Sequence, residues 1–130
     1  MRAFEKTITV VPEDLDDLNH VNNVRFVQWI QDVSKEHWQK VATPVMQKDV
    51  VWVVMNHNIT YKNAAKLDDV VRIRTHIAQS RGATSVRAVE MYNDKTNQLL
   101  LRSTTEWCLL NGITLRPMRI SQDIIQLFSE

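Results

Sequence analysis

Residues 23–40, NVRFVQWIQDVSKEHWQK, decide the fold class of this 130-residue chain. Apolar and aromatic side chains recur in this stretch at spacings of three and four, which is the period of an amphipathic helix. These side chains are Phe26, Trp29, Ile30, Val33 and His37, with Val27 and Trp38 widening the stripe. The segment is therefore predicted to be one long helix with a broad apolar face. Asn22 or Asn23 suits its N-cap, and Thr43-Pro44 lies just past its end.

Strand-like segments lie on both sides of this helix. Residues 3–11 are rich in β-branched types, whereas residues 50–61 and 69–79 alternate apolar with polar side chains. Residues 84–92 and 98–110 are predicted to form a hairpin through a polar turn. In residues 50–61 the alternation predicts a single face that carries Val51, Val53, Met55, Ile59 and Tyr61.

The order of these segments predicts the architecture. A strand, a long helix and then four strands indicate an α+β fold, in which a largely antiparallel sheet packs one face against the helix. A last short helix is expected after Ser121, which is placed as its N-cap. The chain has no linker, repeat or low-complexity stretch, so residues 1–130 are predicted to form a single domain.

Charge and cysteine content narrow the functional classes. The 16 basic and 15 acidic residues are dispersed, which argues against a nucleic-acid or anionic-membrane partner. The single cysteine, Cys108, has no internal disulfide partner, and no Cys/His cluster has zinc spacing. The start lacks the apolar core of a signal peptide, and no apolar run approaches the roughly 18 residues of a membrane helix. A cytoplasmic protein without membrane contact is expected.

The polar segment before the helix, DLDDLNHVNN at residues 14–23, is the strongest candidate for chemistry. A helix start presents unpaired backbone N–H groups and a partial positive charge, which suit an anion or a developing oxyanion. A nearby carboxylate such as Asp16 can act as base or nucleophile, and His20 can orient it or move a proton. Ordinary capping explains the same composition, and Asp14 and Asp17 are expected to be solvated or capping residues.

Two metal-binding alternatives fit this segment poorly. Asp14 and Asp16 begin an EF-hand pattern, but Leu18, Asn19 and Arg25 then stand where an oxygen ligand, a glycine and a bidentate glutamate are needed. A site made of one histidine and carboxylates is also weak, because no second histidine lies nearby. Neither a metal nor a cofactor is therefore expected.

The run from Asp14 to Asn23, with the aromatic-rich helix behind it, resembles the signature of hotdog-fold acyl thioesterases. It is similar both to the bacterial acyl-CoA and 4-hydroxybenzoyl-CoA thioesterase group and to the plant acyl-ACP thioesterases. The likeness continues in ITYKNAA at 59–65, RGATS at 81–85 and LRPMRI at 115–120. It implies a five-stranded antiparallel sheet wrapped around one long helix. It also implies a homodimer or homotetramer with the acyl chain in a cleft between subunits.

The same resemblance assigns roles to individual residues. The catalytic aspartate of these enzymes corresponds to Asp16, the backbone N–H that polarises the thioester carbonyl maps near Asn23, and the histidine of the plant enzymes corresponds to His20. The implied activity is hydrolysis of an acyl-CoA, with an acyl-ACP as the alternative substrate. Separately, Lys62 and Arg81 are candidates for contact with the phosphates of CoA.

Some positions depart from the plant pattern. Leu18 stands where the plant enzymes carry an asparagine, and Ala64 or Ala65 stands where they carry a further acidic or cysteine residue. These departures argue against a plant-type catalytic network and leave an aspartate-centred mechanism intact. Two other classes remain as alternatives: a hotdog dehydratase, whose histidine is placed differently, and a non-catalytic protein that binds acyl-CoA without releasing a thiol.

Overall fold

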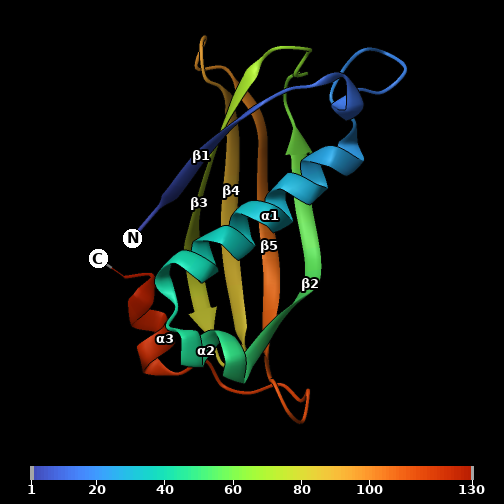
Figure 1. The fold of residues 1–130 in the computed structure, drawn as a ribbon. Helices are drawn as coiled ribbons and strands as arrows, with labels where there is room; N and C mark the ends of the chain where they lie inside the picture. Colours follow the sequence, from blue (N-terminus) through green and yellow to red (C-terminus); the bar gives the residue numbers. More distant parts are fainter. Residues whose placement is uncertain (1, 130) are drawn as a thin grey trace.

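The helix expected from residue 23 is present in the computed structural model, which describes residues 2–129. It is α1 (Asn23–Val41), and the Asn22 side chain caps it by accepting a hydrogen bond from the Val24 N–H. The remaining elements are β1 (Phe4–Thr9), the 3-10 turn η1 (Pro12–Asp14), α2 (Pro44–Asp49), β2 (Val50–Tyr61), β3 (Val70–Arg81), β4 (Thr84–Asn93), β5 (Leu99–Asn111) and α3 (Gln122–Leu127). Figure 1 shows α1 lying across one face of the sheet.

The five strands form one antiparallel sheet in the order β1-β3-β4-β5-β2. Strands β3, β4 and β5 pair with their neighbours in sequence. Strand β1 pairs with β3 at one edge, and β2, which follows the helices, pairs with β5 at the other edge. The chain thus crosses the face of the sheet through α1 between the two edge strands. The predicted α+β fold, an antiparallel five-stranded sheet around one long helix, is confirmed.

The apolar face of α1 is buried against the sheet, as its period predicts. Phe26, Trp29, Ile30 and Val33 are at most 5% exposed. Their neighbours in the core are buried strand residues: Val71, Ile73, Val89, Met91, Leu100 and Leu101. Each such helix side chain contributes about 1.5–3 kcal/mol by leaving water. This burial determines which face of every strand points inward.

The predicted single apolar face of residues 50–61 is wrong. A β-bulge interrupts β2 at Met55, between the paired residues Val54 and Asn56. Because a bulge adds one unpaired residue, the side chains beyond it change face. Ile59 therefore packs against the core, while three members of the predicted set are exposed by 39%, 37% and 55%: Val51, Val53 and Met55.

A second apolar cluster closes the end of the sheet where α2 and α3 lie (Figure 1). Its buried members are Val50, Leu109, Ile120, Ile124 and Phe128. Ser121 caps α3 as predicted, because its hydroxyl accepts a hydrogen bond from the Ile124 N–H at 3.2 Å. Helix α2 was not predicted. Thr43 caps it and Pro44 occupies its first turn, which is where proline is favoured.

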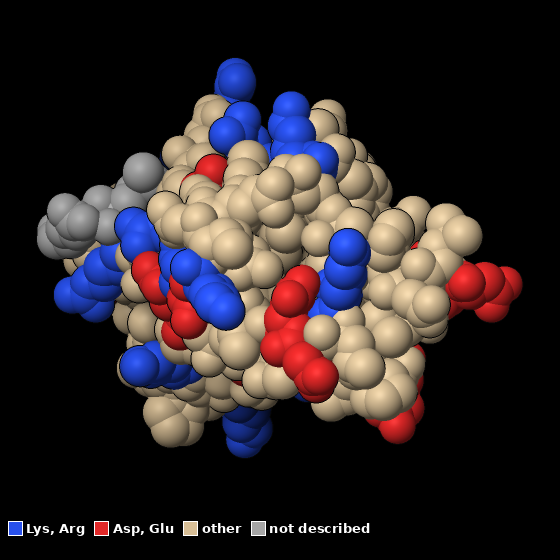
Figure 2. Space-filling model, turned by 90° about the horizontal axis from the view of Figure 1, so that it is seen from above, with Lys and Arg blue, Asp and Glu red and all other residues tan. Residues whose placement is uncertain are grey.

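Charged side chains of both signs share the surface. Figure 2, which looks down on the upper end of Figure 1, shows Lys and Arg beside Asp and Glu. Surface pairs include Lys6–Glu36 at 2.8 Å and Arg74–Glu5 at 2.9 Å. Exposed pairs of this kind contribute about 0–1 kcal/mol each. Within residues 2–129, no helix has the length and apolar character needed to span a membrane.

A polar pair lies inside the interior, where α1 faces β4. Arg87 and His37 are only 4% and 2% exposed. The Arg87 Nη1 donates to Thr75 Oγ1 at 3.1 Å and lies 2.9 Å from His37 Nδ1. Burial, and then the positive charges of Arg87 and Lys40, lower the pKa of His37 from 6.5 to about 4. His37 is therefore neutral at neutral pH, and its Nδ1 accepts the hydrogen bond from the guanidinium.

Protonation of His37 is expected to make folding stability depend on pH. Between pH 6.5 and about 4 the unfolded chain binds a proton at His37 that the folded chain does not. The contribution of His37 to the free energy of unfolding is therefore fully present above pH 6.5 and decreases as the pH falls toward 4. Urea unfolding at several pH values should show a shallower fall for His37→Gln, which keeps an acceptor for Arg87 but does not titrate. Identical pH slopes for the two proteins would contradict this account.

Candidate active site

Residues 14–22 form a tight hairpin that leads directly into α1. The Asn22 N–H donates to the Asp14 carbonyl oxygen at 2.8 Å, and the Asp16 N–H donates to the His20 carbonyl oxygen at 2.8 Å. Asp16 lies two residues along the paired backbone from Asp14, whose carbonyl oxygen bonds to the helix cap, a separation of about 7 Å. The hairpin thus joins Asp16 to the end of α1 that carries the positive end of the helix dipole.

The Asp16 side chain closes the tip of this hairpin. Its Oδ1 accepts hydrogen bonds from the N–H groups of Leu18 at 2.9 Å and His20 at 3.2 Å. The turn requires Asn19 to adopt a φ of 61°, in the left-handed region that asparagine tolerates. Among residues 2–129, Oδ2 of Asp16 has no hydrogen-bond partner. The half-buried carboxylate thus has one oxygen fixed by the backbone and the other available.

Asp14 anchors the hairpin to the helix. It is 6% exposed, and its Oδ2 accepts a hydrogen bond from the Val11 N–H at 3.0 Å. Its Oδ1 lies 3.0 Å from Nε of Arg25 in the first turn of α1. The expectation of a capping residue is confirmed, because the bond from the Val11 N–H caps η1, but the expectation did not include the ion pair with the part-exposed Arg25. Asp17, which is exposed, fits that expectation.

The first turn of α1 leaves one backbone donor free. The Asn22 side chain accepts from the Val24 N–H at 2.9 Å, and the Asn22 carbonyl oxygen accepts from the next two N–H groups at 2.9 and 3.2 Å. The Asn23 N–H has no partner in the part of the chain that the structure describes. A free N–H at a helix start suits a developing oxyanion.

His20 lies on the outer side of the hairpin. Its backbone forms an isolated bridge with Lys66, and the neighbouring Val21 N–H donates to the Ala65 carbonyl oxygen at 2.9 Å. The half-buried imidazole makes no hydrogen bond to any described residue. The described residues also contain no group of three His, Cys, Asp or Glu side chains suited to a metal ion.

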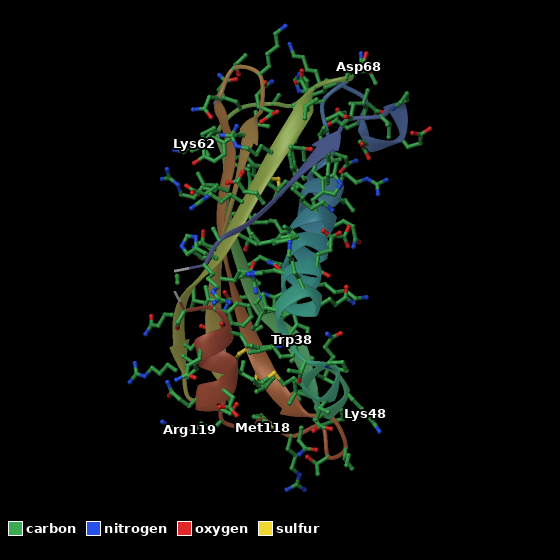
Figure 3. The ribbon with its side chains drawn as sticks, turned by 60° about the vertical axis from the view of Figure 1, so that its left-hand side comes forward. Trp38, Lys48, Lys62, Asp68, Met118 and Arg119 are labelled. Carbon is green, nitrogen blue, oxygen red and sulfur yellow. The ribbon has the colours of Figure 1, made fainter. Side chains whose placement is uncertain are left out.

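Lys62 and Arg81 lie at opposite ends of the sheet. Lys62 follows β2, and Figure 3 shows it at the same end as Asp68, near the hairpin that bonds to residues 65 and 66. Arg81 ends β3 at the turn whose Gly82 carbonyl oxygen accepts from the Ile120 N–H, at the end that carries α3. One chain therefore brings Lys62, but not Arg81, to the end of the sheet that carries Asp16.

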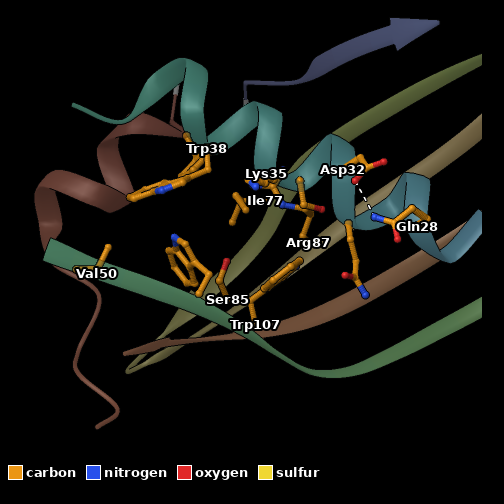
Figure 4. Close-up of a pocket in the computed structure, with 13 residues that line it drawn as sticks. Gln28, Asp32, Lys35, Trp38, Val50, Ile77, Ser85, Arg87 and Trp107 are labelled. Atoms are coloured by element: carbon orange, nitrogen blue, oxygen red, sulfur yellow. Dashed lines mark hydrogen bonds between the residues drawn. The ribbon is translucent and has the colours of Figure 1, made fainter. Parts of the chain in front are cut away.

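An aromatic cavity of about 390 Å³ lies between α1 and strands β2 to β5 (Figure 4). Along α1 its lining extends from Gln28 to Trp38. The volume is in the range of small-molecule sites. Its aromatic walls are Trp38, Trp52, Trp107 and Phe128. The fourth tryptophan, Trp29, lies in the core instead.

Arg87 also lines this cavity and was not among the residues predicted from the sequence. A signal was available, because residues 84–92 alternate and Arg87 shares the inward phase with Val89 and Met91, both fully buried. A charged residue at an inward position of a strand is uncommon unless it is paired or functional.

Comparisons with known proteins identify the family and the fold of the chain. The model of the acyl-ACP thioesterase N-terminal domain family matches residues 2–128. The chain belongs to this family, and the predicted resemblance to the acyl thioesterase family is confirmed. The solved structure of a 4-hydroxybenzoyl-CoA thioesterase mutant, complexed with 4-hydroxybenzoyl-CoA, superimposes with a TM-score of 0.86 at 21% identity, over 99% of this chain and 100% of that one. The shared fold confirms the hotdog architecture.

Relatives of two kinds match the sequence. The oleoyl-acyl carrier protein thioesterase of Coriandrum sativum is 30% identical over 105 residues, which cover 73% of this chain and 28% of that protein. The chain spans between 20% and 28% of the length of the plant relatives that it matches. The acyl-CoA thioester hydrolase YbgC of Escherichia coli is 24% identical over 130 residues, which cover 98% of this chain and 96% of that protein.

Proposed function

We propose that this chain hydrolyses an acyl-CoA thioester to the free acid and CoA, without a cofactor and with Asp16 as the catalytic carboxylate. The observation that carries the proposal is that one short segment holds both an Asp16 carboxylate fixed by two backbone N–H groups and, at the start of α1, an Asn23 N–H without a partner among the described residues. Membership of a thioesterase family and the thioester hydrolase YbgC, which this chain matches over nearly its whole length, support it.

In the general-base route, Asp16 takes a proton from water as the water oxygen attacks the thioester carbonyl carbon. The C–S bond then breaks, the thiolate leaves as CoA, and the acid is released. In the nucleophilic route, Asp16 itself attacks the carbonyl and expels CoA, and water then hydrolyses the anhydride. The free oxygen of the carboxylate serves either route, so both remain open.

The Asn23 N–H is proposed to stabilise the oxyanion. Negative charge develops on the carbonyl oxygen in both routes, and a preorganised donor at that point is worth about 10²–10³ in rate. The positive end of the α1 dipole adds to this field. His20 is proposed to position Asp16, the water or the carbonyl, and Lys62 to meet the phosphates of CoA at the same end of the sheet. Arg81 would reach this site only from a second copy of the chain.

An acyl-ACP is the second candidate substrate. The matching family and the plant relatives, named as acyl carrier protein thioesterases, favour it. Both carriers present the thioester on the same pantetheine arm, so one hairpin serves either of them.

We further propose that the protein is a cytoplasmic homodimer, or a homotetramer built from such dimers. Strand β2 is a 12-residue edge strand with unpaired backbone groups and the exposed apolar residues Val51, Val53 and Met55. The other edge, β1, is 6 residues long, and its exposed positions are Glu5, Thr7 and Thr9. An apolar edge of this kind favours pairing with a second chain, so a second copy is proposed to pair through β2.

The proposed cytoplasmic location fits the cysteine content. Cys108 is a free thiol, as expected in a reducing compartment.

Replacement of the catalytic carboxylate tests the mechanism. Asp16→Asn keeps an oxygen for the Leu18 and His20 N–H groups, so the hairpin should fold normally, but the side chain no longer accepts a proton. Thiol release from a panel of acyl-CoAs and one acyl-ACP is expected to fall by about 10²–10⁴-fold. The matched control is Asp17→Asn on the exposed neighbour, which should retain activity. Near-normal turnover by Asp16→Asn with an unchanged melting temperature would refute the mechanism.

The oxyanion donor has a separate test in Asn23→Pro. Proline at the first helical position is well tolerated, the Asn22 backbone is already extended, and the substitution removes only the free N–H. We expect kcat to fall by about 10²–10³-fold without loss of stability. Asn23→Ala retains the N–H and should retain activity. Equal rates for the proline and alanine variants would remove this donor from the mechanism.

The proposed assembly predicts that a charge on the β2 edge separates the subunits. Val53→Lys should convert a dimer to a monomer in analytical ultracentrifugation, because the ammonium would be buried without a partner at the interface. Thr7→Lys on the β1 edge should leave the assembly intact. A monomeric wild type, or a Val53→Lys protein that still dimerises, would contradict pairing through β2.

A further inference from the structure

The cavity beneath α1 combines aromatic walls with polar side chains from α1 and β4. Trp38, Trp52 and Phe128 form walls on three different elements, and Figure 4 shows Arg87, Ser85 and Trp107 on the sheet side of the opening. Such a lining suits an elongated apolar ligand, with few polar groups to fix its orientation.

Arg87 is a buried cation without a carboxylate. It is 4% exposed, and no described Asp or Glu forms a salt bridge with it. Its Nη1 bonds to His37 and Thr75, and its guanidinium lies 5.5 Å from the centre of the Phe128 ring. Its Nε and Nη2 have no partner among residues 2–129. Other arginines pair with carboxylates at the surface: Arg25, Arg72, Arg74 and Arg102.

The residues around Arg87 do not compensate its charge. Burial lowers the pKa of Arg87 to about 10, so it stays protonated at neutral pH, whereas His37 is neutral there. Asp32 and Lys35 of α1 also line the cavity, but Asp32 accepts its hydrogen bond from Gln28, at 2.8 Å, and makes none to Arg87. A second donor is also free, because Trp107 Nε1 is buried without a partner among the described residues.

We propose that this cavity binds the carboxylate end of an apolar chain, with the carboxylate on Arg87 and the chain along the aromatic walls. A carboxylate accepts two hydrogen bonds from a guanidinium, which matches the free Nε and Nη2. The pair neutralises a charge that is costly to bury alone. The four aromatic walls then cover the chain.

Such a carboxylate has two possible sources. It can be the carboxylate of the acid that thioester hydrolysis releases. That acid would either reverse its orientation within the cavity or bind again from solution. It can also be a second carboxyl group at the far end of the acyl chain of a substrate. Arg87 meets α1 at His37, about 21 Å along the helix from Asn23, so the second source requires a long chain. Both sources rest on the proposed function, whereas binding of a free acid at Arg87 does not.

A binding titration tests the inference without any turnover. Decanoic acid and decanol have the same chain and differ in the charged end, and the cavity tryptophans report binding of either by a change in fluorescence. The wild type should bind the acid about tenfold more tightly than the alcohol, because hydrogen bonds between charged groups exceed neutral ones. Equal affinities in the wild type would overturn the inference.

Two variants connect that preference to Arg87. In Arg87→Gln the preference for the acid should disappear. Because a buried substitution can unfold the protein, Ser85→Asp provides a second test that keeps Arg87. Ser85 lines the cavity two residues away on the same face of β4, so an aspartate there supplies the missing carboxylate internally and should also abolish the preference. The control is Ser85→Asn, whose side chain has the size of aspartate but no charge, and it should keep the preference for the acid. A preference retained in Ser85→Asp would overturn the inference.

Thiol release separates the two sources. The substrates are the CoA thioester of a long-chain monocarboxylic acid and that of the dicarboxylic acid of equal length. Faster release from the dicarboxylic thioester, lost in Ser85→Asp, supports the substrate carboxyl. Equal release with preferential binding of decanoic acid supports the product carboxylate. Absence of release from every acyl-CoA and acyl-ACP, with acid binding intact, overturns the proposed function and leaves the carboxylate site standing.

Discussion

Burial of the apolar face of α1 against the sheet is the interaction on which the rest of the structure depends. Phe26, Trp29, Ile30 and Val33 leave water together, and the strands present their inward side chains to them. The helix can cover only one face, so the sheet must be antiparallel with edge strands joined through the crossing helix. The position of α1 then determines where the hairpin at its start lies. It also determines the position of the cavity beneath its second half.

The candidate active site depends on that helix in a second way. A helix start leaves backbone donors that must be satisfied, and here Asn22 accepts from the Val24 and Arg25 N–H groups while the Asn23 N–H has no partner among the described residues. The hairpin that precedes the helix uses the carboxylate of Asp16 to close its own tip, so the group proposed for chemistry is also part of the local architecture. Asp14 and its ion pair with Arg25 keep the two parts in register.

The cavity shows the opposite arrangement, in which the fold carries a cost. A buried guanidinium bonded to a neutral imidazole and a hydroxyl has little compensation for its lost hydration. A hydrophobic residue at Arg87 would pack in the same phase of β4 as Val89 without this cost. The charge therefore agrees with a site that recognises a ligand, and it distinguishes this part of the interior from the apolar core around Ile73 and Met91.

The sequence by itself determined the features that depend on neighbours within a few residues. The 3.6-residue period defined α1, capping chemistry marked Asn22 and Ser121, and strict alternation assigned the faces of β3, where Val71, Ile73 and Thr75 are buried. The resemblance carried by residues 14–23 located the hairpin. The bulge at Met55, the neutral partner of Arg87 and the separation of Lys62 from Arg81 were decided by the tertiary structure alone. Each of these depends on pairing between segments distant in the chain, such as β2 with β5, which local propensity does not specify.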